Sequence, residues 1–217
     1  MSARSLGEVE ALVRKAARGA GRSWGMAEEA GRAARWLETY GLPGGALAAA
    51  LLEETDGVDQ AALMPRPDEA GAWRPAGGGG MCPIAAGAAL SDMAAIQPGE
   101  LRLGPVLWPL MMLPHLAQSA RQCGRPLRLI CDGLPLEVTG AGAPLPPPAG
   151  VLAADRAGEV LCRAADATAA APLERRFRAD AAAEVIVRLE TLAARIYAPE
   201  TPERRLSGAG AGLTDND

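Results

Sequence analysis

The residue best placed for chemistry is Cys82, which follows Gly77–Gly80 and Met81 and directly precedes Pro83. Proline suits the first position of a helix, so this pattern predicts that Cys82 lies at a helix N-terminus. The free amides and the dipole at such a terminus lower the pKa of a thiol and stabilise an anion. Cys82 is therefore a candidate nucleophile. The alternative is a small residue at a helix start with no chemical role.

A second candidate site combines one tryptophan, two carboxylates and one arginine within nine residues. Trp24 and Arg32 are candidate ligand-binding residues, and Glu28 and Glu29 are candidate acid–base catalysts. The same residues also suit an ordinary helix start. Ser23 can cap the helix, acidic residues are favourable in its first turns, and Glu28 can pair with Arg32.

The C-terminal stretch alternates glycine with small residues and then becomes acidic. Successive amides in such a stretch can form a nest for an anion, and its carboxylates can pair with arginines. The candidate ligand-binding residues here are Ser207, Gly208, Gly210, Gly212 and Asp215. By composition alone, the stretch is equally typical of a flexible tail that becomes ordered on a partner.

The other side chains that bind metals elsewhere form no recognisable motif. His115 is the only histidine, and its apolar neighbours favour a structural position. The four cysteines, Cys82, Cys123, Cys131 and Cys162, contain no Cys-x-x-Cys pair, so we expect reduced thiols and no zinc site. No Walker lysine or dinucleotide fingerprint is present, so we expect no cofactor.

Composition limits the class of protein. Alanine supplies 47 of the 217 residues, whereas Leu, Ile, Val and Phe together number 42, which predicts an ordered but thin, alanine-packed core. The net charge of −4 argues against a general nucleic-acid binder. No apolar run is long enough for a membrane span and no secretory signal opens the sequence, so we expect a cytoplasmic protein.

Hydrophobic periodicity predicts helices first and strands later. Helical patterns cover residues 6–20, 25–40, 44–54, 83–96, 109–122 and 180–197. Strand patterns cover residues 101–107, 126–131, 134–138, 151–154, 159–164 and 174–179, with hairpin signals at 132–133 and 155–158. Prolines and glycines predict a flexible loop at residues 65–81.

These elements predict an α+β fold in a single domain, residues 1–217. Its N-terminal helical half spans about residues 1–123. The other half, about residues 124–217, is a small, mostly antiparallel sheet with a packed C-terminal helix.

Three segments resemble an uncharacterised bacterial family of domains of unknown function, of about this length. They are residues 21–31, with Trp-Gly-Met-Ala-Glu-Glu-Ala-Gly from Trp24; residues 82–87, Cys-Pro-Ile-Ala-Ala-Gly; and residues 198–217. The resemblance brings no activity. It implies that the Trp24 segment, Cys82 and the tail belong to the family's pattern, whereas His115 does not.

Two functional hypotheses follow. In the first, the chain is an enzyme acting on a small anionic metabolite, in a pocket formed by residues 24–32, Cys82 and the tail, with Arg32 as the anion clamp. In the second, it is a non-catalytic binding module or partner subunit, or a homo-oligomer, whose glycine-rich tail docks on another chain. Neither hypothesis involves nucleic acid, a membrane, a metal or a cofactor.

Overall fold

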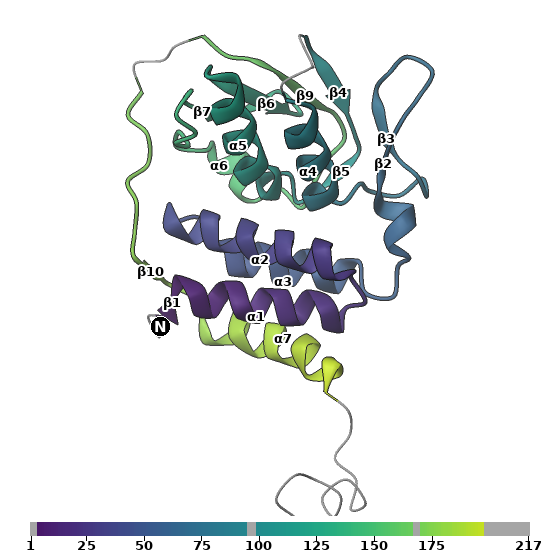
Figure 1. The fold of residues 1–217 in the computed structure, drawn as a ribbon, viewed down its shortest axis with the longest axis vertical. Helices are drawn as coiled ribbons and strands as arrows, with labels where there is room; N and C mark the ends of the chain where they lie inside the picture. Colours follow the sequence, from purple (N-terminus) through teal and green to yellow (C-terminus); the bar gives the residue numbers. More distant parts are fainter. Residues whose placement is uncertain (1–3, 95–98, 167–169, 198–217) are drawn as a thin grey trace, which may run out of the picture.

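The computed structural model describes residues 4–94, 99–166 and 170–197. Its elements are stacked in layers (Figure 1). Helices α1 (Leu6–Gly19) and α7 (Ala183–Ala193) form an outer layer. Helices α2 (Trp24–Thr39) and α3 (Gly44–Glu54) lie in the middle, and α4 (Pro83–Met93), α5 (Leu113–Cys123) and a mixed sheet lie beyond them. The fold is α+β, as predicted.

Local capping explains where the first two helices begin. The backbone N–H of Glu8 donates to Ser5 Oγ at 3.1 Å, and the backbone N–H of Ser5 donates to the Glu8 carboxylate at 2.7 Å. This reciprocal pair is the capping box that the sequence indicates. At the second helix, the N–H of Met26 donates to Ser23 Oγ at 3.4 Å. Both predicted helix starts are therefore confirmed to within a residue.

The helices of the outer and middle layers approach one another so closely that side chains are excluded at three contacts, one within each layer and one between them. A Cβ on Gly19 of α1 would lie 1.8 Å from the carbonyl oxygen of Leu192 in α7. A Cβ on Gly31 of α2 would lie 2.8 Å from the carbonyl oxygen of Glu10 in α1, and one on Gly44 of α3 would meet α2 similarly. Alanines fill the positions between, so the helices pack through small residues.

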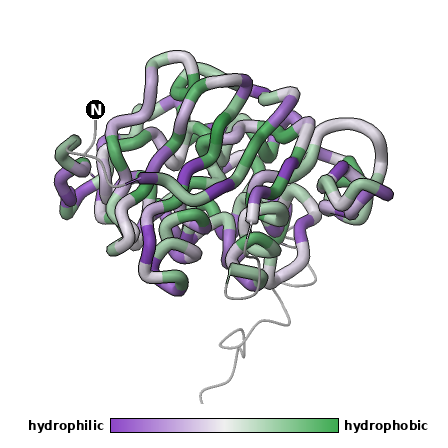
Figure 2. Tube along the Cα trace, turned by 90° about the horizontal axis from the view of Figure 1, so that it is seen from above, coloured by the Kyte–Doolittle hydropathy of each residue, from purple (hydrophilic) through white to green (hydrophobic). Residues whose placement is uncertain are grey.

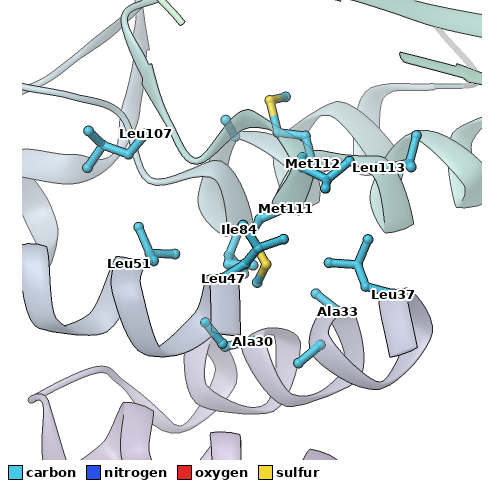
Figure 3. Packing of buried hydrophobic residues seen from close by; sticks show 14 of the residues in the cluster. Ala30, Ala33, Leu37, Leu47, Leu51, Ile84, Leu107, Met111, Met112 and Leu113 are labelled. Atoms are coloured by element: carbon cyan, nitrogen blue, oxygen red, sulfur yellow. The ribbon is translucent and has the colours of Figure 1, made fainter. Parts of the chain in front are cut away.

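The core continues from the middle layer into the other half of the molecule. Figure 3 shows Ile84 of α4 and Met111 of the short helix η2 (Pro109–Met112) close to Leu47 of α3 and to Ala30 and Ala33 of α2. All five side chains are buried. The apolar neighbours of His115 in the sequence belong to this core, in agreement with the sequence analysis. They are Met111, Met112, Leu113 and Leu116, and all are buried.

The main sheet has the strand order β2-β3-β4-β9-β6-β7. Its strands are β2 (Pro65–Pro67), β3 (Trp73–Pro75), β4 (Leu101–Leu103), β6 (Leu127–Cys131), β7 (Leu134–Val138) and β9 (Val160–Ala164). Neighbouring strands run antiparallel except β3 and β4, which are parallel. Apolar and hydrophilic residues follow one another in short stretches along the chain (Figure 2), and β6 alternates between buried and half-buried positions.

Several predicted elements differ in the structure. Residues 65–81 contain the β2–β3 hairpin after the one-turn helix η1 (Gln60–Leu63), so the segment predicted as a flexible loop contributes two short strands to the sheet. The segment 101–107 divides into β4 and β5 (Val106–Leu107), and β5 pairs with β8 (Arg156–Ala157). Of the residues predicted as a strand at 151–154, the first two lie in α6 (Ala149–Leu152) and the other two follow it.

The end of the chain also differs from expectation. The strand predicted at 174–179 is reduced to β10 (Arg178–Ala179), which pairs with β1 (Arg4–Ser5) across the molecule. Helix α7 is followed by η3 (Ala194–Ile196). Ile196, which lies within the helical pattern predicted over residues 180–197, is exposed.

The hairpin predicted at Asp132-Gly133 is confirmed, and its aspartate has a further role. Asp132 takes a left-handed backbone conformation with φ of 45°, which suits a two-residue hairpin turn. Its carboxylate accepts the N–H groups of Gly158 and Glu159 at 2.9 and 2.8 Å. One side chain thereby ties the β6–β7 turn to the turn before β9.

The close contact between α4 and α5 gives a test of the packing. A Cβ on Gly87 would lie 2.5 Å from the His115 ring, within a buried interface. We expect Gly87→Ala to lower the free energy of unfolding by about 1–3 kcal/mol, because overpacking forces side chains from their rotamers. Urea unfolding measures the change.

The matched control is Gly7→Ala, since a Cβ on Gly7 meets nothing within 4 Å. This variant should be neutral or more stable by up to about 1 kcal/mol. Equal effects of the two substitutions would contradict the packing at Gly87.

Candidate functional site

A groove of about 580 Å³ lies where α1, the start of α2 and η3 meet, and we call it the Trp24 groove. Its lining residues are Arg14, Lys15 and Arg18 of α1, Trp24 and Glu28 of α2, and Arg195 and Ile196 of η3. Two consecutive helices and the distant segment η3 therefore build one site.

Helix geometry and a buried arginine position this groove. Arg14 and Arg18 are one helical turn apart and so share a face of α1. The turn between α1 and α2 is held by Arg22, whose buried guanidinium donates to the carbonyl oxygens of Thr55 and Val58, the latter at 3.2 Å. These carbonyls follow the end of α3, where helix carbonyls lack partners within the helix. Arg22 thus fixes the point at which α2 begins with Trp24.

The charges in the groove are unevenly compensated. Arg195 pairs with Asp56 at 2.7 Å, and Glu28 pairs with Arg32 at 3.0 Å. In the part of the chain that the structure describes, Arg14 and Lys15 have no ion-pair partner, and neither does Arg18. Three adjacent positive charges on α1 therefore have no carboxylate partner within residues 4–94, 99–166 and 170–197.

Trp24 gives the groove an aromatic wall. Its side chain is 67% exposed, which is unusual for the largest apolar residue type. The guanidinium carbon of Arg18 lies 4.5 Å from the centre of the ring, a cation–π distance. Ile196 is 41% exposed on the same groove. The site therefore offers both cations and apolar surface.

The structure brings together only some of the residues singled out from the sequence. Trp24 and Glu28 line the Trp24 groove. Arg32 points its guanidinium at both Glu28 and Glu29, at 3.0 and 2.5 Å, and lines a different groove. This is the pairing that the simpler helix-start interpretation predicts. Catalysis by Glu28 or Glu29 stays a prediction.

Cys82 precedes α4 as its N-cap residue, as predicted, but it lines neither of these grooves. It is half-buried, and burial raises the pKa of its thiol. The backbone N–H groups of Ile84 and Ala85 and the Arg22 guanidinium act in the opposite direction without outweighing burial. The structure therefore raises the pKa of the Cys82 thiol, whereas the sequence predicted that it is lowered.

The tail candidates Ser207, Gly208, Gly210, Gly212 and Asp215 lie outside the described residues. The chain reaches that tail from η3, which lines the Trp24 groove. The sequence interpretation missed the basic residues of the groove. The spacing of Arg14 and Arg18 is a signal that could have found two of them, whereas nothing local to Arg195 places it beside α1.

The sole histidine is structural. His115 is buried on α5, and its Nε2 has no hydrogen-bond partner among the described residues. Burial lowers its pKa to about 4, against a smaller opposing effect of Asp92. Within the described ranges, no group of three or more His, Cys, Asp or Glu side chains could hold a metal ion. In the same ranges, no helix is both long and apolar enough to cross a bilayer.

The raised pKa of Cys82 predicts a thiol that reacts slowly with electrophiles at neutral pH. Its alkylation by iodoacetamide should increase with pH without an inflection below about 8.5, because only the thiolate reacts. Mass spectrometry of the peptide containing Cys82 follows the rate, with half-buried Cys123 as the internal comparison. An inflection at Cys82 between about pH 6 and 7 would show an activated nucleophile instead.

The lowered pKa of His115 predicts a pH-dependent stability. The unfolded chain takes up a proton near pH 6.5 and the folded chain only near pH 4, so stability is full above 6.5 and falls as the pH drops. Between pH 7.5 and 5, the loss attributable to this group should be about 2 kcal/mol.

Urea unfolding of the native protein and of His115→Gln at both pH values isolates this contribution, because the other groups are common to both proteins. The variant should lose less stability on acidification. Parallel pH profiles would refute the assignment.

Residues 4–78 match the model of a family described as a protein of unknown function, DUF3726. The matched stretch contains α1, α2 and α3, and hence the α1 and α2 walls of the Trp24 groove. It also covers the Trp24 motif that resembles a family of unknown function, whereas Cys82 and the tail lie beyond it. No curated protein and no solved structure matches the chain.

Proposed function

We propose that this protein binds a small, multiply charged anion carrying an apolar or planar part, in the Trp24 groove. The observation that carries the proposal is a set of three cations beside an exposed tryptophan. These cations, Arg14, Lys15 and Arg18, form no ion pair with any residue that the structure describes. Exposed like charges on one helix repel each other, so an anion that neutralises them relieves that cost.

Binding is favoured over catalysis by the chemistry of the lining. Among the residues that line the groove, Glu28 is the sole carboxylate, and its ion pair with Arg32 already engages it. Cys82, the candidate nucleophile, lies elsewhere and has a raised pKa. The groove therefore has groups that hold an anion, and none placed to act on it as a nucleophile.

The apolar part of the ligand follows from Trp24 and Ile196. A purely polar anion would leave both side chains in water, whereas a ring or hydrocarbon segment would cover them. Aromatic contacts of this kind contribute about 0.5–1.5 kcal/mol beyond the area they bury. A ligand with both features uses the whole groove.

Benzene-1,3,5-tricarboxylate is a suitable probe, because it combines three negative charges with a planar ring. Calorimetric titration should show binding that weakens with added salt, as expected for exposed charges. Citrate, which has the same number of carboxylates and no ring, should bind more weakly. The double variant Arg14→Ala/Lys15→Ala should lose about tenfold or more in affinity, equivalent to about 1.4 kcal/mol.

A charge-matched control is Arg66→Ala/Arg125→Ala, which removes two exposed arginines outside the groove. Trp24→Ala should reduce binding of the aromatic probe but leave that of citrate nearly unchanged. Equal losses in the two double variants would mean that net charge alone drives binding, and the proposed function would fail.

A further inference from the structure

A second groove, of about 640 Å³, lies on another side of the α1–α2 pair, and we call it the Trp36 groove. Its lining residues are Glu10, Arg32, Arg35, Trp36, Thr39, Tyr40, Arg121, Ala141 and Arg175. It shares no lining residue with the Trp24 groove. It is built by α1, α2, α5, the loop after β7 and a segment near the end of the described chain, residues 170–179, which we call the strap.

The strap, residues 170–179, is pinned beside this groove. The backbone N–H of Arg176 donates to the carbonyl oxygen of Thr39 at 2.6 Å. The Arg176 guanidinium fits against Gly41, where a Cβ would lie 2.6 Å from its central carbon. Next to Thr39, the buried Glu38 carboxylate accepts the N–H of Gly45 at 2.9 Å and so joins α2 to α3. Arg175 is therefore held at the groove by its neighbours in the chain.

The ion pairs leave two arginines of the Trp36 groove uncompensated. Arg35 pairs with Glu10 at 2.8 Å, and Arg32 is engaged by Glu28 and Glu29. Across the described residues, Arg121 and Arg175 take part in no ion pair. The Arg121 guanidinium lies against Gly142, where a Cβ would be 2.6 Å from one of its nitrogens. These two guanidinium groups come from separate segments and meet at one groove.

An aromatic pair lies beside these arginines. The rings of Trp36 and Tyr40 have centroids 4.7 Å apart and are tilted by 52°. Both side chains are half-buried. The Trp36 indole N–H and the Tyr40 hydroxyl donate to no acceptor in the described part of the chain. The groove thus combines apolar ring surface with two unused donors and two unpaired guanidiniums.

From this combination, we infer that the Trp36 groove is a second binding site, for a phosphate monoester of a planar aromatic group. A phosphate monoester carries about −1.5 to −2 charge at pH 7, which two guanidiniums neutralise. Guanidinium forks match the geometry of phosphate oxygens, and they form charge-assisted hydrogen bonds with them. The planar part packs on the rings of Trp36 and Tyr40, which line the same groove as the two guanidinium groups.

The inference is independent of the Trp24 groove, because different residues carry it. There the unpaired cations are three and lie on one helix, whereas here they are two and converge from α5 and the strap. The two sites therefore favour ligands of different charge and shape, and each has its own variants.

Phenyl phosphate is the probe, measured by calorimetric titration against the full chain at low salt. The variant Arg121→Ala/Arg175→Ala should weaken its binding at least tenfold, since it removes the two guanidinium groups proposed to hold the phosphate. Arg121→Lys/Arg175→Lys keeps the charge and removes the forks, so it should recover only part of the affinity. Arg66→Ala/Arg125→Ala removes the same number of charges from outside both grooves and should leave phenyl phosphate binding within about twofold of the native value.

Two further measurements test the aromatic part. Inorganic phosphate should bind several-fold more weakly than phenyl phosphate, and Trp36→Phe should retain binding because a ring remains. Far-ultraviolet circular dichroism verifies that each variant folds. The inference is overturned by any of three results: no binding of phenyl phosphate to the native chain, equal binding of inorganic phosphate, or an equal loss in the two alanine double variants.

Discussion

The whole arrangement depends on how closely four helices, α1, α2, α3 and α7, approach one another. At Gly19, Gly31 and Gly44, the backbone of one helix touches its neighbour where no Cβ fits, and alanines continue those contacts. A core with few large aliphatic residues buries less apolar area per residue, so close backbone approach is the means by which it still excludes water. The position of α1 between α2 and α7 follows from these contacts.

That packing decides which charged side chains have partners. With α1 against α2, Glu10 reaches Arg35, while Glu28 and Glu29 are engaged by Arg32 on their own helix. Arg14, Lys15 and Arg18 face no carboxylate that they pair with in the described structure. Ion pairs therefore neutralise the middle of the α1–α2 pair, whereas the edge that carries Arg14, Lys15 and Arg18 stays positively charged. Such a distribution attracts anions to particular places on a chain whose net charge is −4.

What the sequence predicts well is local, and what it misses is brought together by tertiary contacts. The capping box at Ser5 and Glu8, the Glu28–Arg32 pairing and the turn at Asp132 each involve residues within four positions, so spacing alone reveals them. The strands at 65–67 and 73–75 contain three prolines and little alternation. They pair with each other, and the second of them also pairs with the distant β4, so tertiary contacts stabilise them. The grooves escape prediction for the same reason, because Arg195, Arg121 and Arg175 reach them from separate elements.

The use of arginine instead of lysine determines how the charge of the Trp36 groove responds to pH. All four cations that line the Trp36 groove are arginines, whose guanidinium groups keep their proton throughout the range in which cells live. The lone imidazole is sealed between α4 and α5, away from both grooves. The positive charge of these four arginines is therefore constant near pH 7. If ligand binding in this groove changes with pH near neutrality, the change will reflect the second ionisation of the ligand's phosphate and not a change in the charge of these arginines.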